Sequence, residues 1–316
     1  MEKFEKTVFG DSVIYNADAF DVLPTLADEA IDICLTDMPY ATESFGGKCT
    51  ACEWDTPINL PEFWRLLECK AKPQANVVLF CNMKLAYDLI GSNLKGFRSD
   101  LVFAKPSQRV GHLNSNNQVM RAHENILLFR RPKFSGTAFY NPVKTAGGQP
   151  RVNRGKARQS GGVYPPGRDY TSVSNGEVHP ISVLAFDRDR NLPDWCAHPT
   201  MKPLNLLGYL LMLYSEPGQV VLDCFSGSGS TACAAYRLGR RFIAVEKEKK
   251  YYDIACRRLE EIHQRKTARR QLTLLSFSSN PADANPTASE SEPAVPPETE
   301  SQQQNCEATN LQEDSI

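Results

Sequence analysis

Side chains suited to chemistry on an amine follow an apolar segment near the start of the chain. Residues 31–40 read IDICLTDMPY, so Asp37, Met38, Pro39 and Tyr40 come directly after a predicted strand. The Asp37 carboxylate and the Met38 backbone carbonyl could accept hydrogen bonds from the two N–H groups of a planar amine. Tyr40 could stack on the ring that bears this amine. Such acceptors favour a pyramidal nitrogen whose lone pair can attack. The string is short, and a strand-to-loop turn explains it equally well.

A glycine-rich turn follows another apolar segment, in residues 220–231 (VVLDCFSGSGST). The strand predicted there ends at Asp223, the turn contains Gly227 and Gly229, and a helix is expected to begin near Ser230. Glycines let a ligand approach the backbone closely, and open α/β sheets bind ligands at such turns. The next predicted strand precedes an acid, Glu246, that suits a ribose diol. The pattern is typical of a dinucleotide site or an S-adenosylmethionine site; the alternative is a turn that binds nothing.

Four motifs, taken in order, resemble those of the DNA amino-methyltransferases. Residues 37–40 resemble the DPPY motif of that family, and residues 223–229 (DCFSGSG) resemble its FxGxG cofactor motif. Between them lie an RxHE-like segment, residues 121–125 (RAHEN), and a close match to the HPTxKP box, residues 198–203 (HPTMKP). The order is that of the β subgroup. Residues 40–55, which end in CEWD, also resemble the loop after DPPY in phage-type adenine methylases.

The resemblance, which covers about residues 10–262, implies that the cofactor is S-adenosylmethionine. The turn would cradle it, Glu246 would hold its ribose hydroxyls, and Asp18 would meet its adenine end. Thr200 and Lys202 would lie near its methionine carboxylate. The expected cofactor site is Asp18, Ala19, Asp37, His198, Thr200, Lys202, Asp223, Phe225, Gly227, Gly229, Ser230, Thr231 and Glu246. Simpler interpretations are a salt bridge for Asp18, a helix N-cap for Thr200 and a packing histidine for His198.

The resemblance further implies a DNA adenine-N6 methyltransferase that flips its target base out of the duplex. Asp37, Met38, Pro39 and Tyr40 would be its catalytic residues, and direct attack by N6 would need no cysteine nucleophile. The family usually has proline at position 38. The Met38 carbonyl can make the same contact, so activity is expected to be retained but slowed, because proline fixes φ and methionine does not.

Three other functions fit parts of the same pattern. The nearest is N4-cytosine methylation, which uses the same chemistry; Asp37 favours adenine by resemblance, because cytosine enzymes more often have serine there. A DNA-binding protein with a decayed active site would explain Met38, but Asp37, Tyr40 and the glycine turn are intact. A nicotinamide oxidoreductase would use the same sheet, but it explains neither HPTMKP nor DMPY.

The charges are unevenly distributed along the chain. The formal net charge is −1, yet residues 275–316 carry eight acidic residues and no Lys or Arg, while residues 104–170 carry twelve Lys or Arg and two acidic residues. A basic stretch inside a globular chain indicates a polyanionic partner, unless it is a solvated surface loop. The resemblance implies that this partner is double-stranded DNA. The expected DNA-binding residues are Lys105, Arg109, Arg121, Lys144, Arg151, Arg154, Lys156, Arg158 and Arg168. The resemblance leaves open a homodimer and a cognate restriction endonuclease.

Strands alternate with helices along the chain, which predicts an α/β fold with a mostly parallel sheet and helices on both faces. The resemblance implies that this sheet is Rossmann-like and mixed. Strands are expected at residues 12–16, 31–36, 76–81, 100–104, 125–129, 219–223 and 241–245, and helices at 60–71, 83–94, 203–214, 230–238 and 246–270. The motif order is circularly permuted. The expected parts are a catalytic half (10–130), an inserted basic target-recognition region (131–190) and a cofactor-binding half (191–270). Residues 133–189 show no clear elements, and residues 275–316 are expected to be a disordered acidic tail.

Composition narrows the class of protein. The chain has 316 residues, of which 41% are hydrophobic and 23% charged, which excludes collagen-like and coiled-coil proteins. No apolar run is long enough for a membrane span and no secretory signal is recognisable, so a soluble, cytoplasmic protein is expected. Among ten cysteines, only Cys49 and Cys52 have the spacing of metal ligands. They make half a zinc site without a second pair; we expect no metal and a loop with two reduced thiols.

Overall fold

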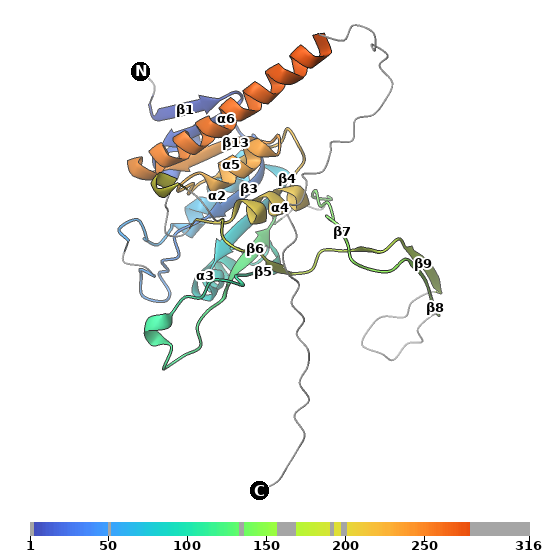
Figure 1. Cartoon of the computed structure of the whole chain (residues 1–316). Coiled ribbons are helices and arrows are strands. Elements are labelled where there is room, and N and C mark those ends of the chain that lie inside the picture. Colours follow the sequence, from blue (N-terminus) through green and yellow to red (C-terminus); the bar gives the residue numbers. More distant parts are fainter. Residues whose placement is uncertain are drawn as a thin grey trace. The chain divides into compact units, whose positions relative to one another are not determined.

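Nine strands form the central sheet of the computed structural model, which describes residues 3–49, 52–132, 136–156, 169–189, 193–196 and 201–278 (Figure 1). Their order is β1-β2-β13-β12-β3-β4-β6-β5-β11. They are β1 (Glu5–Phe9), β2 (Ser12–Asn16), β3 (Ile31–Asp37), β4 (Ala71–Cys81), β5 (Phe97–Ala104), β6 (His123–Phe129), β11 (Val183–Ala185), β12 (Val220–Asp223) and β13 (Arg241–Glu246). The pairs β1–β2, β4–β6 and β5–β6 are antiparallel, and the other neighbours are parallel. The predicted mixed, mostly parallel sheet is confirmed.

Helices cover both faces of this sheet, because successive side chains of a strand point to opposite faces. In β4, Val78 and Phe80 share a buried apolar cluster with α4 (Leu204–Tyr214), α5 (Ser230–Arg237) and α6 (Lys249–Ser278). Val77 and Leu79 share another with α1 (Ala19–Val22), α2 (Leu60–Lys70) and α3 (Met83–Ser92). Single 3₁₀ turns lie at Leu23–Thr25, His112–Asn114 and Asp194–Cys196. Within the described residues, no helix has the length and apolarity that a bilayer span requires.

The helices after β3 and β4 begin at asparagines, which satisfy backbone N–H groups that have no partner in the first turn. The Asn59 side chain accepts from the Glu62 N–H at 3.2 Å, and the Asn82 side chain accepts from the Leu85 N–H at 2.9 Å. These caps fix where α2 and α3 start. They therefore also fix the lengths of the loops at the carboxyl ends of β3 and β4.

The expected elements are present, with differences at their ends. The helix predicted from residue 246 begins at Lys249, because Glu246 ends β13 and its carboxylate accepts the Glu248 N–H at 2.8 Å. At its other end α6 reaches Ser278, past the expected start of the acidic tail at residue 275. Residues 279–316 lie outside the described residues. The sequence pattern predicts neither β1 nor α1, since β1 has a single buried residue and α1 only one turn.

The expectation that residues 133–189 lack clear elements is wrong. This region contains β11, a small pairing of β7 (Thr145–Ala146) with β10 (Glu177–Val178), and an antiparallel ribbon of β8 (Arg151–Gly155) with β9 (Tyr170–Ser174). The ribbon lies apart from the nine-stranded sheet (Figure 1). Neither of its faces is buried in a core, so its sequence lacks the apolar alternation by which a half-buried strand is recognised.

Candidate active site

A cavity of about 530 Å³ opens where three neighbouring strands end. Asp37, Asp223 and Glu246 are the last residues of β3, β12 and β13, which are parallel neighbours in the sheet. Their carboxylates therefore meet at one edge, where open α/β sheets bind ligands. The rest of the lining comes from residues 17–20, 38–40, 53–59, 224–228 and 247–248, together with Glu124, Met201, Lys202, Leu207, Ser230, Thr231 and Tyr251.

The glycine turn is shaped by positive φ angles and by packing against α6. Gly227 has φ +52° and Gly229 has φ +77°, and Gly229 is the N-cap of α5. A Cβ atom on Gly229 would lie 2.7 Å from the Cβ of Ala255, so glycine also permits close contact between the turn and α6. The sequence analysis assigned this turn to cofactor binding but did not include its support from α6.

That support includes a buried arginine that the sequence analysis missed. Arg258 of α6 donates to the Ser228 carbonyl at 2.6 Å, to the Ser228 hydroxyl at 3.1 Å and to the Ser230 hydroxyl at 3.0 Å. It is 7% exposed. The available signal was its position among the apolar residues of α6, since an arginine on a buried helix face needs polar partners. Arg258 thus fixes the turn from the side that packs against α6, and leaves the side that faces the cavity free for a ligand.

Asp223 and Glu246 are buried carboxylates with neutral hydrogen-bond donors. Asp223 accepts from the Thr36 hydroxyl at 2.6 Å and from the Phe225 N–H at 3.3 Å. Glu246 accepts from the Gly227 N–H at 2.6 Å as well as from Glu248. Burial raises the pKa of Asp223 to about 6 and that of Glu246 to about 7, although these hydrogen bonds act in the opposite direction.

The residues present fit a polar ligand with hydroxyl groups, such as a nucleoside. Ser226 lines the cavity, and its buried hydroxyl has no hydrogen-bond partner among the described residues. An unpartnered buried hydroxyl is costly unless a ligand or water completes it. The Asp223 and Glu246 carboxylates supply acceptors along this part of the cavity, and the Ser226 hydroxyl supplies a donor. The fit agrees with the cofactor predicted from the sequence.

Asp18 and Ala19 line the cavity beside the end of β13, where α1 begins. The Asp18 carboxylate caps α1 by accepting the Phe20 N–H at 2.9 Å, and it pairs with the Lys247 ammonium at 3.1 Å. The salt bridge considered in the sequence analysis is therefore present. Both residues of the pair still line the cavity, so this contact does not remove Asp18 from the candidate cofactor site.

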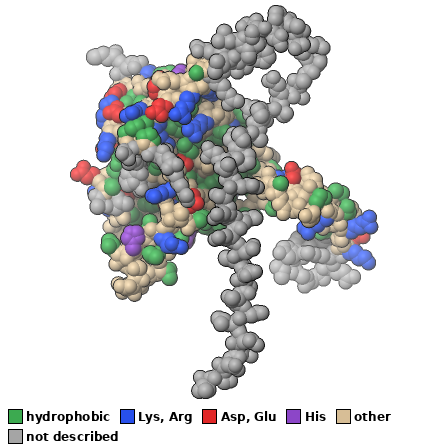
Figure 2. All heavy atoms as spheres, in the orientation of Figure 1, with side chains coloured by type: hydrophobic (Ala, Val, Ile, Leu, Met, Phe, Trp, Pro, Cys, Tyr) green, Lys and Arg blue, Asp and Glu red, His purple; other side chains and the backbone are tan. Residues whose placement is uncertain are grey.

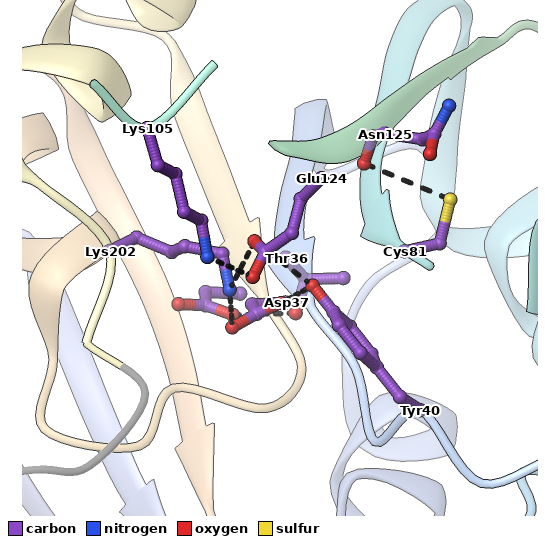
Figure 3. A network of polar contacts seen from close by, with 9 residues as sticks. Thr36, Asp37, Tyr40, Cys81, Lys105, Glu124, Asn125 and Lys202 are labelled. Carbon is purple, nitrogen blue, oxygen red and sulfur yellow. Dashed lines mark hydrogen bonds and ion pairs between the residues drawn. The ribbon is translucent and has the colours of Figure 1, made fainter. Parts of the chain in front are cut away.

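Asp37 and Tyr40 face a group of charged side chains (Figure 3). The Tyr40 hydroxyl donates to Asp37 Oδ1 at 3.0 Å and lies 3.4 Å from Glu124 Oε2. The Lys202 ammonium contacts Asp37 Oδ2 and lies 3.4 Å from Glu124 Oε2. Lys105 pairs with the other oxygen of Glu124. Two lysines thus balance two carboxylates in one network.

The electrostatics of this network differ between its two acids. Burial raises the pKa of Asp37, the negative charge of Glu124 adds to the effect, and Lys202 opposes it. Burial also acts to raise the pKa of Glu124, but Lys202 and Lys105 outweigh it, so its pKa is lowered. The pKa of Lys202 is raised, because both carboxylates outweigh the burial of its ammonium. Glu124 is therefore the more firmly ionised of the two acids.

Met38 and Pro39 turn the chain away from β3, and both side chains are buried. Met38 is 2% exposed and belongs to the apolar cluster beneath α1, α2 and α3. Its flexible side chain fills that layer, a role in which methionine is common. The residue that departs from the DPPY pattern therefore also has a packing role, which the sequence analysis did not anticipate.

The loop after Tyr40 is organised by a buried aspartate that the sequence analysis quoted without a role. Asp55 is fully buried, and its carboxylate accepts from the Ala41 N–H at 2.9 Å and the Cys49 N–H at 2.8 Å. The Cys49 thiol lies 3.0 Å from the Tyr40 carbonyl. Within the described residues, no group of three metal-ligating side chains occurs. The end of this loop lines the cavity through Glu53, Trp54 and Asp55.

The expected DNA-binding residues are spread over several environments. Arg109, Arg121, Lys144, Arg151, Arg154 and Lys156 are exposed. Lys105 is placed differently: its ammonium is engaged by Glu124 inside the network, with 15% of the side chain exposed, because β5 ends beside the cavity. Lys144 is also paired, with Glu177 at 3.4 Å. Arg158, Arg168, His198 and Thr200 lie outside the described residues.

Comparisons with known proteins agree with this geometry. Residues 31–257 match the model of the N6/N4 methyltransferase family, described as DNA methylase. The type II methyltransferase M.BglII of Bacillus subtilis is 27% identical over 263 residues, which cover 77% of this chain and 67% of that protein. The type II methyltransferase M.HinfI of Haemophilus influenzae is 28% identical over 267 residues, covering 79% and 69%.

A solved structure shares the fold. The PvuII DNA methyltransferase, which is named as cytosine-N4-specific, superposes with a TM-score of 0.58 and covers 83% of this chain and 96% of its own. Its sequence is 16% identical, so the likeness concerns the fold alone.

Proposed function

Because the chain belongs to the N6/N4 DNA methylase family, we propose that it methylates the exocyclic N6 of adenine in double-stranded DNA. As a member of this family it is an S-adenosylmethionine-dependent DNA methyltransferase, and the choice of adenine is what we add. One observation carries the proposal. Asp37 and Tyr40 lie at the end of β3, on the same cavity as the glycine turn and Glu246.

The cofactor would occupy the half of the cavity formed by β12, β13 and α1. Asp223, Phe225, Gly227, Gly229, Ser230 and Thr231 would cradle it, with Glu246 at its ribose, Asp18 and Ala19 at its adenine, and His198, Thr200 and Lys202 at its methionine end. The Ser226 hydroxyl, which has no partner in the part of the chain that the structure describes, would also find one there. When bound, S-adenosylmethionine supplies an electrophilic methyl group.

The target base would occupy the half near Asp37. An adenine inside a duplex is out of reach, so the enzyme would flip it out at a modest unstacking cost. Tyr40 would stack on the flipped ring. Asp37 and the Met38 carbonyl would accept hydrogen bonds from the two N–H groups of its amine. These contacts direct the nitrogen lone pair at the methyl carbon, which is catalysis by positioning and preorganised electrostatics.

Methylation of cytosine N4 is the second candidate. The PvuII enzyme, whose fold this chain shares, is named as cytosine-N4-specific. At 16% identity that likeness carries no information on the base. Asp37 favours adenine through its resemblance to the DPPY motif, and the two candidates predict different products from the same reaction.

DNA would contact the exposed basic residues of the inserted region, above all the β8–β9 ribbon. Figure 2 shows Lys and Arg side chains gathered at this ribbon, where Arg151, Arg154 and Lys156 are exposed. Arg151 and Arg154 are three residues apart in a strand and so point to opposite faces. A two-stranded ribbon fits the major groove, where phosphates line both sides. This arrangement supports a role in target recognition for residues 131–190.

The relatives suggest the setting. Since M.BglII and M.HinfI are named as type II methyltransferases, we place the chain in a restriction-modification system in the cytoplasm, paired with an endonuclease that cuts the same sequence. A homodimer is part of the same proposal. Both partners are testable by co-purification and by the mass of the chain in solution.

The reaction is tested with purified protein, labelled S-adenosylmethionine and unmethylated duplex DNA. The chain should transfer label to DNA. The Asp37→Ala variant should bind the cofactor within about threefold of the wild-type affinity yet lose at least about 100-fold in transfer rate, the scale on which one preorganised contact acts. Normal turnover by Asp37→Ala would contradict the proposed site.

A further inference from the structure

The carboxylate that the proposed reaction needs is already in contact with two donors. Asp37 Oδ1 accepts the Tyr40 hydroxyl, and Oδ2 contacts the Lys202 ammonium. Spare lone pairs remain on both oxygens. The ammonium nevertheless neutralises the carboxylate, and it would repel the positive charge that develops on an attacking amine nitrogen. Both donors have to loosen their hold on Asp37 before an amine can be activated there.

Glu124 offers an alternative acceptor to both donors. Its Oε2 lies 3.4 Å from the Tyr40 hydroxyl and 3.4 Å from Lys202 Nζ. The phenolic hydroxyl has a single hydrogen, so Tyr40 donates either to Asp37 or to Glu124. The ammonium has three hydrogens, so Lys202 can contact both carboxylates while it moves from one to the other. Glu124 enters the network from β6 (His123–Phe129), and Asp37 enters it from the end of β3 (Figure 3).

Lys105 fixes Glu124 for this role. It pairs with Oε1 and leaves Oε2 directed at Tyr40 and Lys202. The Lys202 side chain is 7% exposed and that of Glu124 17%, so water is poorly placed to take over an ammonium released by Asp37. The total charge stays the same when Lys202 moves from one carboxylate to the other, because no proton is gained or lost.

We propose that Glu124 is a positioning residue that takes over the Lys202 ammonium and the Tyr40 hydroxyl from Asp37 when the target amine enters. The Asp37 carboxylate then accepts from the amine with its full negative charge. Lys105 holds Glu124 in place throughout. This inference rests on the proposed function, and it adds Glu124 and Lys105 to the groups on which the transfer rate depends.

The first test is Glu124→Gln, which keeps the size of the side chain and removes its charge. Methyl transfer in a single turnover should fall at least about 30-fold, because Lys202 then stays on Asp37. Affinity for S-adenosylmethionine should change less than about threefold, and fluorescence of 2-aminopurine at the target position should still report base flipping. Glu124→Asp should recover part of the lost rate. Glu68→Gln, an exposed acid on α2, is the control and should leave the rate unchanged.

A double-mutant cycle separates this role from a structural one. In a Lys202→Met background there is no ammonium to take over, so Glu124→Gln should cost much less than in the wild-type chain. An equal cost in both backgrounds would contradict the inference, as would a Glu124→Gln rate within twofold of wild type. Loss of all single-turnover transfer in Lys202→Met, at an S-adenosylmethionine concentration that saturates this variant, would show that the ammonium itself is required and would also overturn it. A wild-type chain without transfer to DNA would instead refute the proposed function.

Discussion

The carboxylates at three neighbouring strand ends differ in the groups that offset the effect of burial on their pKa values. Asp37 faces the Lys202 ammonium, whereas the donors that the structure describes for Asp223 and Glu246 are threonine hydroxyls and backbone N–H groups. Neutral donors offset burial less than a cation does. Asp223 and Glu246, with pKa values of about 6 and about 7, therefore titrate near neutral pH, at the position proposed for the cofactor.

This titration predicts how stability depends on pH. Both folded-state pKa values lie above the ordinary values of 3.8 and 4.5, so between about pH 4 and pH 7 the folded chain binds protons that the unfolded chain has lost. The contribution of these two carboxyl groups to the free energy of unfolding of the cofactor-free chain should therefore decrease as pH rises through this window. Glu246→Gln should remove about 1–3 kcal/mol of that fall, measured by denaturant unfolding at several pH values. Glu216→Gln is an exposed control; an unchanged slope in Glu246→Gln would contradict the assignment.

Met38 gives a second prediction at the same scale. Met38→Pro restores the family's DPPY string and its rigidity, so kcat should be equal to or above that of the wild type at a temperature where the variant is folded. The buried methionine side chain is lost, which should cost about 2 kcal/mol of unfolding free energy. Met38→Leu, which conserves volume, should change both quantities little. A reduced kcat in folded Met38→Pro would show that rigidity at this position is not what the reaction needs.

At the scale of elements, the strand ends that border the cavity were predictable and the contacts between distant segments were not. Apolar runs that end in Asp37 and Asp223, and a strand leading to Glu246, identify three strand ends, and the parallel fold brings them together. Arg258, Asp55 and Lys105 act through partners that no periodic pattern connects to them. Glu124 was quoted as part of the RxHE-like segment, yet its contacts with Lys202 and Tyr40 depend on how β6 lies beside β4. The ribbon was missed because solvent on both faces removes the apolar alternation.

The contact between the glycine turn and α6 gives a prediction for an element. Gly229→Ala places a methyl group 2.7 Å from the Ala255 Cβ at φ +77°, so strain and overlap should together cost about 3 kcal/mol of unfolding free energy. Gly239→Ala is a matched control, because it has φ +71° and open space around the new Cβ. It should cost only the backbone strain, about 1 kcal/mol. Equal losses in the two variants, measured by denaturant unfolding, would contradict the packing argument.

At the scale of the whole molecule, a chain of nearly zero net charge presents locally basic surface. The formal net charge is −1, while the described part of the inserted region exposes Arg151, Arg154 and Lys156 on or beside one ribbon. Long-range attraction to a polyanion follows the local field more than the total charge. Affinity for DNA should therefore depend on these residues and on salt.

Arg154→Ala tests the ribbon. Loss of one phosphate contact should make the plot of log affinity against log salt less steep by about 0.9, without changing cofactor affinity. Lys95→Ala is the control: this exposed residue precedes β5, at the sheet edge opposite the cavity, and its loss should leave the slope unchanged. Equal slopes for Arg154→Ala and the wild type would remove β8 from the DNA contact.

The central claim is tested most directly by the identity of the methylated base. Unmethylated DNA would be incubated with the wild-type chain and S-adenosylmethionine, digested to nucleosides and analysed by mass. The account predicts N6-methyladenine, absent from the Asp37→Ala control. N4-methylcytosine would keep the fold and the chemistry of the site but contradict the choice of base, and no methylated nucleoside at all, with the cofactor still bound, would contradict the proposed activity.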